Sequence, residues 1–384
     1  MSPKNRRIAF SASATVVLIL AATLAWRLAT RDKGEQPVRI GALLALTGSG
    51  ANYGKSLQQG IELAKNQVNS AGGINGQRLQ VIYEDSQGDA KTGVSAFNKL
   101  ISVDHVPLVL GSISSVILAV APIADQRQVV LVNSSAISPK ICDYANNFLF
   151  SLMVSGAEEA RFMASTFTRI HPATPLAILF SNNASGIDTR NVLQDTLRGA
   201  GVPVAASEGY ELNATDFRTQ LAKIKASGAR YGYLIAFSSA EFARVLRQSK
   251  DLALDLHWFS YSGLETKETI DLASDAAEGV VYSYPQYSPE SKAVEDFQAL
   301  YKSTYGSWAD IYTVTSFDAV KLVCSVIKNK GRSAIDIRDG LRGQLNYQGL
   351  FGAWTFGTKQ CVASRLMWKT VKNGQYIPLR EPTQ

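Results

Sequence analysis

The chain has few of the residues that enzymes and metalloproteins place at their active centres. Its 384 residues include three cysteines and three histidines. Cys142, Cys324 and Cys361 lie far apart, in none of the spacings that hold zinc, and the histidines are isolated from one another. Neither an H-E-x-x-H pair nor a G-x-S-x-G elbow is present. We therefore predict that the protein is not an enzyme and that it needs no cofactor or metal.

Charge is also scarce and is unevenly spread. Charged residues make up 18% of the chain and the net charge is +7, but the first 36 residues hold six basic against two acidic side chains. The remaining chain then carries +3, which is too little and too scattered for binding nucleic acid. A content of 46% hydrophobic residues over this length predicts a globular protein of about two domains.

The first 36 residues have the pattern of an export signal. Lys4, Arg6 and Arg7 precede an uncharged, largely apolar run from Ile8 to Trp26. That run is also long enough to span a bilayer, so residues 1–36 are predicted to be either a cleaved signal peptide or a membrane anchor. Both alternatives place the rest of the chain outside the cytoplasm, in the periplasm.

An exported location affects whether the cysteines are expected to form a disulfide. In an oxidising compartment one pair could form a disulfide and leave one thiol free. Three small apolar core residues are the alternative, and the sequence does not decide between the two. No cysteine lies near the apolar run, which disfavours a lipoprotein.

From Val38 the chain alternates between predicted strands and helices. Residues 38–44 form a short apolar run, an amphipathic helix follows, and Gly72-Gly73 and Asn75-Gly76 turn the chain into the next strand. The strands read as continuous apolar runs, which indicates sheets covered on both faces. The same rhythm restarts after Phe150. Two successive sets of β-α units predict an α/β protein with two similar lobes.

Two local motifs admit a ligand-binding and a structural interpretation. TGSGANYGKS at residues 47–56 is close to a phosphate-binding loop, but its glycines are out of register, so a plain β-α loop is favoured. DSQGD at residues 85–89 lacks the ligand spacing of an EF-hand, and a turn followed by a helix cap at Asp89 is favoured.

Small polar residues follow two neighbouring predicted strands. Ser114 and Ser115 come after the strand that ends at Gly111, and Ser135 comes after the next strand. Parallel α/β sheets bind small ligands at the carboxyl ends of their strands, and helix N-termini there favour anions. Ordinary helix caps are the competing interpretation for each serine alone.

Several of these segments together resemble a known family. IGALLALTGSGANYG, GIELAKNQVNSAGGINGQRLQVIYEDSQGD, VPLVLGSISS and VVLVNSSAISP are similar to the periplasmic branched-chain amino acid binding proteins. These are type I solute receptors of ABC transporters. The resemblance implies two Rossmann-like lobes with parallel sheets joined by a hinge of three crossings, near residues 155, 284 and 358. The lobes would comprise residues 38–155 plus 284–357, and residues 156–283 plus 358–380.

The resemblance also implies a function and a site. The lobes would close on a small solute and present it to an ABC transporter permease, without any reaction. Ser114 would bind a ligand carboxylate, and Ser135 and Ala136 would line the pocket. Tyr53 and Tyr312 match pocket aromatics of the family, although core packing is an alternative for both.

This chain departs from the family at several pocket positions, two of which would hold the ligand ammonium: Ile137 and Ser262. Ile137 stands where the family usually has a threonine, and Ser185 stands where it has an aromatic residue. Phe237 and Ser238 stand where a tyrosine is common. The acidic partner of the ammonium falls at Ser262, unless the loop shifts so that Glu265 supplies the charge. An ammonium buried without its carboxylate loses a bond worth roughly 1.5–3 kcal/mol. A carboxylate without an amine, or an amide, is therefore the expected ligand.

Two other functions remain open from the sequence. An exported domain that senses a ligand and reports to a signalling partner would use the same site. An enzyme would need a base and a nucleophile within reach of each other, and the sequence offers no such pair.

Overall fold

The computed structural model describes residues 36–144, 147–287, 291–343, 347–354, 356 and 360–382. The predicted signal or anchor, with its apolar run Ile8–Trp26, lies outside these ranges, as does the crossing predicted near residue 358. None of the described helices combines the length and the apolar character needed to cross a membrane.

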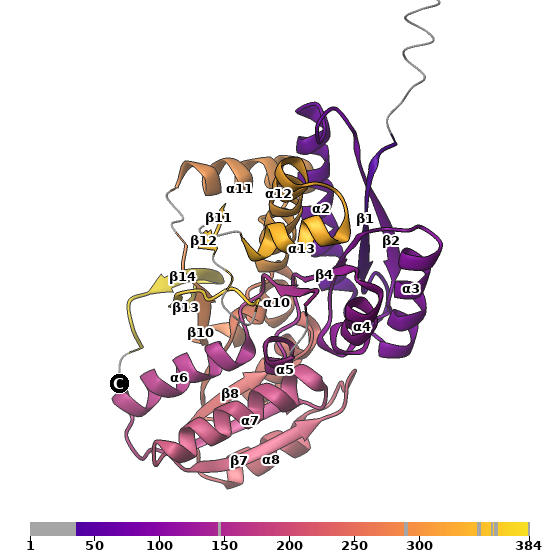
Figure 1. The fold of residues 1–384 in the computed structure, drawn as a ribbon. Helices are drawn as coiled ribbons and strands as arrows, with labels where there is room; N and C mark the ends of the chain where they lie inside the picture. The colour runs from indigo at the N-terminus through magenta and orange to yellow at the C-terminus, as the bar shows by residue number, and fades with distance from the viewer. Residues whose placement is uncertain are drawn as a thin grey trace, which may run out of the picture. The chain divides into compact units, whose positions relative to one another are not determined.

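The first half of the chain forms a five-stranded sheet with the strand order β2-β1-β3-β4-β5 (Figure 1). The pairs β1–β3, β3–β4 and β4–β5 are parallel. Its strands are β1 (Val38–Leu44), β2 (Leu79–Asp85), β3 (Leu108–Gly111), β4 (Val130–Asn133) and β5 (Leu149–Ser151). Every residue of β3, β4 and β5 is buried, as continuous apolar runs predict for a sheet covered on both faces.

Helices from distant parts of the chain cover this sheet. Phe97, Val109 and Ile117 belong to the core between the sheet and the helices α3 and α4. On α2, Gly60 allows α12 to approach closely, because a Cβ atom there would lie 2.2 Å from the Thr313 carbonyl oxygen. Figure 1 shows α12 beside α2. The helices named are α2 (Ala51–Ser70), α3 (Ala90–Ser102), α4 (Ser114–Arg127) and α12 (Ile311–Lys330).

The second half forms a seven-stranded sheet with the order β14-β13-β10-β9-β8-β6-β7. The strands β7, β6, β8, β9 and β10 pair in parallel, whereas β13 and β14 are antiparallel additions at one edge. The strands are β6 (Leu176–Ser181), β7 (Val204–Tyr210), β8 (Tyr231–Ile235), β9 (His257–Ser260), β10 (Val281–Pro285), β13 (Leu366–Lys372) and β14 (Gln375–Leu379). Two predominantly parallel sheets confirm the predicted α/β class, and the antiparallel edge is a departure from it.

Polar side chains cap most helices of the second half, whereas α8 follows Phe217 and has no capping side chain. At the start of α7 the Asn183 side chain accepts the Gly186 N–H at 2.8 Å. These helices are α6 (Gly156–Ile170), α7 (Ala184–Gly199), α8 (Arg218–Ala226), α9 (Ser239–Asp251) and α10 (Lys267–Ala273). The sequence analysis did not predict α10.

The remaining elements follow the second sheet in the chain. They are the helices α11 (Lys292–Tyr305) and α13 (Ala334–Arg342) and a small hairpin of β11 (Tyr347–Gly349) and β12 (Gly352–Trp354). The short helix α5 (Pro139–Asp143) precedes β5.

The structure decides between the two interpretations of the cysteines. Cys142 of α5 and Cys361 form a disulfide, and Cys324 is a buried free thiol on α12. Cys361 lies beside β5, where the Ser151 N–H donates to the Gln360 carbonyl oxygen at 3.0 Å. The disulfide therefore ties the segment around residue 361 to the edge of the five-stranded sheet.

Candidate functional site

A small cavity of about 30 Å³ lies at the carboxyl ends of strands from both sheets. Eight of the eleven predicted site residues line it, together with two residues that were not predicted. The lining consists of Tyr53, Ile113, Ser114, Ser135, Ala136, Ile137, Ser185, Phe237, Tyr261 and Tyr312. We call this space the serine cavity.

The N-terminus of α4 opens beside the serine cavity without a capping side chain. The residue before it, Ile113, has a φ of 65°, a strained value for a β-branched residue. The Ser138 N–H donates to Ser114 Oγ at 3.2 Å, and the Ile113 N–H donates to Ser135 Oγ at 3.4 Å. Uncapped N–H groups and the helix dipole favour an anion at this point.

Asn133 holds the second serine loop in place. It is fully buried at the end of β4 and donates through Nδ2 to the Ala136 carbonyl oxygen and to Ser151 Oγ, both at 2.8 Å. Its Oδ1 accepts the N–H groups of Ala136 at 2.8 Å and Ser135 at 3.2 Å. Asn133 thus acts as a positioning residue for Ser135 and Ala136.

Tyrosines form the opposite wall of the serine cavity. The rings of Tyr53 and Tyr312 are 4.4 Å apart between centroids. Burial raises the pKa of both hydroxyls far above the usual range, so both remain neutral. The Tyr53 hydroxyl is buried with no hydrogen-bond partner among the described residues. Such an orphaned polar group is costly unless something in the cavity pairs with it.

Tyr261 lines the same cavity and was missed in the sequence. Its hydroxyl donates to the Ala236 carbonyl oxygen at 2.6 Å, which holds the ring against the cavity. The available signal was its position at the end of β9, next to the predicted Ser262.

Three predicted residues do not line the serine cavity. The Ser115 hydroxyl points elsewhere and donates to the Gly88 carbonyl oxygen at 3.4 Å. Ser238 caps α9 by accepting the Glu241 N–H at 3.2 Å. Ser262 is fully buried behind the cavity and donates both its N–H and its Oγ–H to Glu159, at 2.9 and 2.7 Å.

Glu159 on α6 is a buried acid that the sequence analysis overlooked. The hydroxyl of Ser283 is its third hydrogen-bond donor. Burial raises the pKa of Glu159 to about 7, although these donors counteract part of the effect. Its oxygens are therefore already paired with protein groups.

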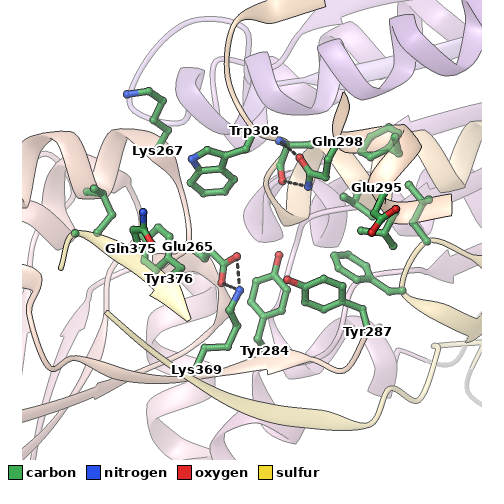
Figure 2. A pocket seen from close by; sticks show the side chains of 18 of the residues that line it. Glu265, Lys267, Tyr284, Tyr287, Glu295, Gln298, Trp308, Lys369, Gln375 and Tyr376 are labelled. Carbon is green, nitrogen blue, oxygen red and sulfur yellow. Dashed lines mark hydrogen bonds and ion pairs between the residues drawn. The ribbon is translucent and has the colours of Figure 1, made fainter. Parts of the chain in front are cut away.

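Glu265, the alternative acid considered in the sequence, is also paired. Its carboxylate is buried and lies 2.6 Å from Lys369 Nζ (Figure 2). The Tyr282 hydroxyl also donates to it. Glu265 does not line the serine cavity. The position of Ser262 therefore holds no acid, and the carboxylate of Glu265 is not free to pair with a ligand in the serine cavity.

The two motifs with open interpretations have structural roles. The Asp85 carboxylate accepts the N–H groups of Leu46 and Thr47, at 2.9 and 3.3 Å, so the loop that resembles a phosphate-binding loop is already occupied by an acid. Asp89 caps α3 by accepting the Thr92 N–H at 2.8 Å. Within the described ranges no three acidic, histidine or cysteine side chains gather as metal ligands would.

Two predominantly parallel sheets place a small cavity at the carboxyl ends of their strands, the edge at which open α/β folds bind small ligands. A family model described as "Periplasmic binding protein" matches residues 37–371. The chain belongs to the periplasmic binding protein family. This membership confirms the resemblance seen in the sequence, and it places the family's site of action outside the cytoplasm.

Relatives illustrate the range of the family. The leucine-, isoleucine-, valine-, threonine- and alanine-binding protein of Pseudomonas aeruginosa is 26% identical over 79% of this chain and 82% of its own length. A leucine binding protein LivK from Thermotoga maritima superposes with a TM-score of 0.82 at 20% identity, covering 89% of this chain and 97% of that one.

An ABC transporter solute binding protein from R. palustris, solved in complex with benzoate, has the same fold. It also superposes with a TM-score of 0.82, at 15% identity over 90% of this chain and 96% of its own. These structures confirm the predicted fold class, that of type I periplasmic binding proteins. Solute binding rather than catalysis is the common property of these relatives.

Proposed function

We propose that the protein captures a small carboxylate that lacks an α-amine and delivers it to an ABC transporter permease. The observation that carries this proposal is the uncapped N-terminus of α4 beside Ser114, opposite a wall without a free acid. The N-terminus of α4 favours an anion. An ammonium group would find no counter-charge in the wall, because no free acid lines it. The benzoate bound by the R. palustris protein supports this ligand class.

The same residues disfavour an amino acid. Ile137 contributes an apolar side chain where an ammonium would need an acceptor, and Ser262 is committed to Glu159. Aromatic residues supply most of the remaining wall, so the body of the ligand is apolar. A branched aliphatic or aromatic carboxylate has both an anionic group without an amine and an apolar body.

Capture would proceed by opening and closing. A cavity of about 30 Å³ holds one or two water molecules and no organic acid, so the walls must separate to admit a ligand. The proposed lobes are residues 38–155 plus 284–357 and residues 156–283 plus 358–380. A ligand that touches both favours the closed form by its differential affinity.

The matched test is calorimetry with leucine and 4-methylpentanoate, which differ in the α-amine alone. We expect 4-methylpentanoate to bind at least tenfold more tightly, with benzoate as a second amine-free ligand. Tighter binding of leucine would contradict the proposal.

A pair of serine variants tests the site. Ser114→Ala removes a hydroxyl that lines the cavity and is expected to weaken carboxylate binding by about 10–100-fold, the loss of one bond to a charged group. Ser115→Ala is the control, since its hydroxyl bonds the Gly88 carbonyl outside the cavity. Equal effects of the two variants would place the ligand elsewhere. The sensor alternative gains no support from the named relatives.

A further inference from the structure

The largest cavity described for the chain is not the serine cavity. It has a volume of about 720 Å³, within the range of small-molecule sites, and shares no lining residue with the serine cavity. We call it the aromatic pocket. Its walls come from α10, the end of β10, α11, the segment before α12, the β11–β12 turn, β13 and β14.

Six aromatic side chains line the aromatic pocket, and five of them form two groups. Tyr284, Tyr287 and Phe351 contact one another edge to face or tilted, with centroids 5.7–5.9 Å apart. Trp308 and Tyr376 form the second group, at 5.8 Å. Figure 2 shows Trp308 on one side of the space and Tyr284 with Tyr287 on the other. Phe297 of α11 is the sixth. Facing ring walls are suited to a planar apolar molecule.

Hydrogen bonds hold the segments that carry Trp308 and Tyr376. The Gln298 side chain donates to the Ala309 carbonyl oxygen at 3.0 Å and accepts the Ala309 N–H at 2.9 Å, which joins α11 to the segment that carries Trp308. The Tyr376 hydroxyl bonds the carbonyl oxygens of Leu264 at 2.9 Å and Thr266 at 3.0 Å. These two parts of the wall are thus held in place before a ligand binds, which lowers the entropic cost of binding.

The charges buried in the aromatic pocket neutralise one another. Lys369 is 2% exposed, lies 2.6 Å from Glu265, and places its ammonium over the ring of Tyr284 at 4.6 Å. At the rim, Lys267 pairs with Asp271 on an exposed turn of α10. The buried charges are already paired, and the remaining acid in the lining, Glu295, is exposed to solvent on α11, so an uncharged ligand is favoured in the interior of the pocket.

We propose that the aromatic pocket is a second binding site, which takes an uncharged ring compound between Trp308 and the Tyr284–Tyr287–Phe351 group. The two spaces share no lining residue, so a substitution at Ser114 removes no group of the aromatic pocket, although residues of both proposed lobes line each space.

The test uses the full chain and N-phenyl-1-naphthylamine, an uncharged fluorescent ring compound. We expect one molecule to bind at micromolar concentration, with a rise in fluorescence. Trp308→Ala and Phe351→Ala, both at half-buried positions, are each expected to weaken this binding at least tenfold. Circular dichroism and melting temperature establish that both variants fold.

Two control variants locate the probe. Tyr305→Ala alters a half-buried aromatic residue on α11 outside the pocket and should leave probe affinity unchanged. Ser114→Ala should weaken carboxylates and leave the probe unaffected. The proposal is overturned if the wild-type protein does not bind the probe, if the folded pocket variants bind it as well as the wild type does, or if Ser114→Ala abolishes its binding.

Discussion

Glu159 shows how a single buried residue can combine stability and specificity. Its carboxylate accepts three hydrogen bonds, two of them from Ser262, at the position where the family places the partner of the ligand ammonium. The Glu159 carboxyl group thus lies close to that position, but its oxygens are bonded to Ser262 and Ser283. Glu159 therefore does not line the serine cavity.

Glu159 predicts a pH dependence of stability. Its pKa is about 7 in the folded protein and near 4.5 in the unfolded chain, so the folded state binds the proton more tightly. The free energy of unfolding therefore falls as the pH rises from about 4.5 through 7, by about 3 kcal/mol in total. Glu159→Gln should make this decline smaller, measured by denaturant unfolding across that range, while Asp318, whose pKa burial also raises to about 7, contributes the part that remains.

The geometry allows glutamine at this position. Its carbonyl oxygen can accept from the Ser262 N–H and from Ser283, and its amide can donate to Ser262 Oγ once that hydroxyl rotates. An unchanged pH profile in the folded variant would mean that Glu159 is not the group responsible.

At the scale of elements, the disulfide is the strongest constraint on the end of the chain. Cys142 and Cys361 are 219 residues apart in sequence, so their bond closes a very long loop. The bond fixes residues 360–362 beside β5, where Ser151 pairs with both Gln360 and Val362 through backbone hydrogen bonds.

Reduction of this disulfide is expected to lower the free energy of unfolding by about 2–5 kcal/mol. The measurement is urea unfolding with and without reductant. Cys324→Ala is the matched control, because Cys324 is a buried thiol outside the disulfide and its variant should respond to reductant as the wild type does. If the double variant Cys142→Ser/Cys361→Ser matched the stability of the oxidised protein, the disulfide would contribute nothing.

For the whole molecule, hydrogen bonds join the elements of the two sheets across the serine cavity. Asn52 Nδ2 on α2 donates to Ser239 Oγ on α9 at 2.7 Å, and the Ser138 hydroxyl donates to Asp188 Oδ2 on α7 at 2.6 Å. In the proposed mechanism these bonds exist in the closed form alone. They therefore favour closure even before a ligand binds.

Removing both bonds should favour the open form. At about 1 kcal/mol for each hydrogen bond, Asn52→Ala/Ser138→Ala shifts the equilibrium by about 2 kcal/mol, roughly thirtyfold. We expect a larger radius of gyration by small-angle X-ray scattering without ligand, and weaker carboxylate binding. Lys223→Ala breaks an ion pair between α8 and Glu208 of β7, both within one proposed lobe, and is the control. An unchanged radius would contradict the role given to these bonds.

The sequence by itself determined the α/β class and most of the serine cavity. Continuous apolar runs followed by Gly111-Ser112 and Asn133-Ser134 are local signals, and parallel strands bring their ends to one edge whatever the details of packing. Local sequence was therefore sufficient to place Ser114, Ser135 and the neighbouring loops. Elements with weak local patterns, such as α13 and β14, could not be placed in this way.

The tertiary structure alone decided which side chains line the serine cavity and which contact one another. Ser262 and Glu159 are 103 residues apart in sequence, and Glu265 and Lys369 are 104 apart, so no local pattern reveals either pair. The disulfide and the aromatic pocket likewise join distant segments. Pairing depends on how helices pack onto sheets, and that packing is a property of the whole chain.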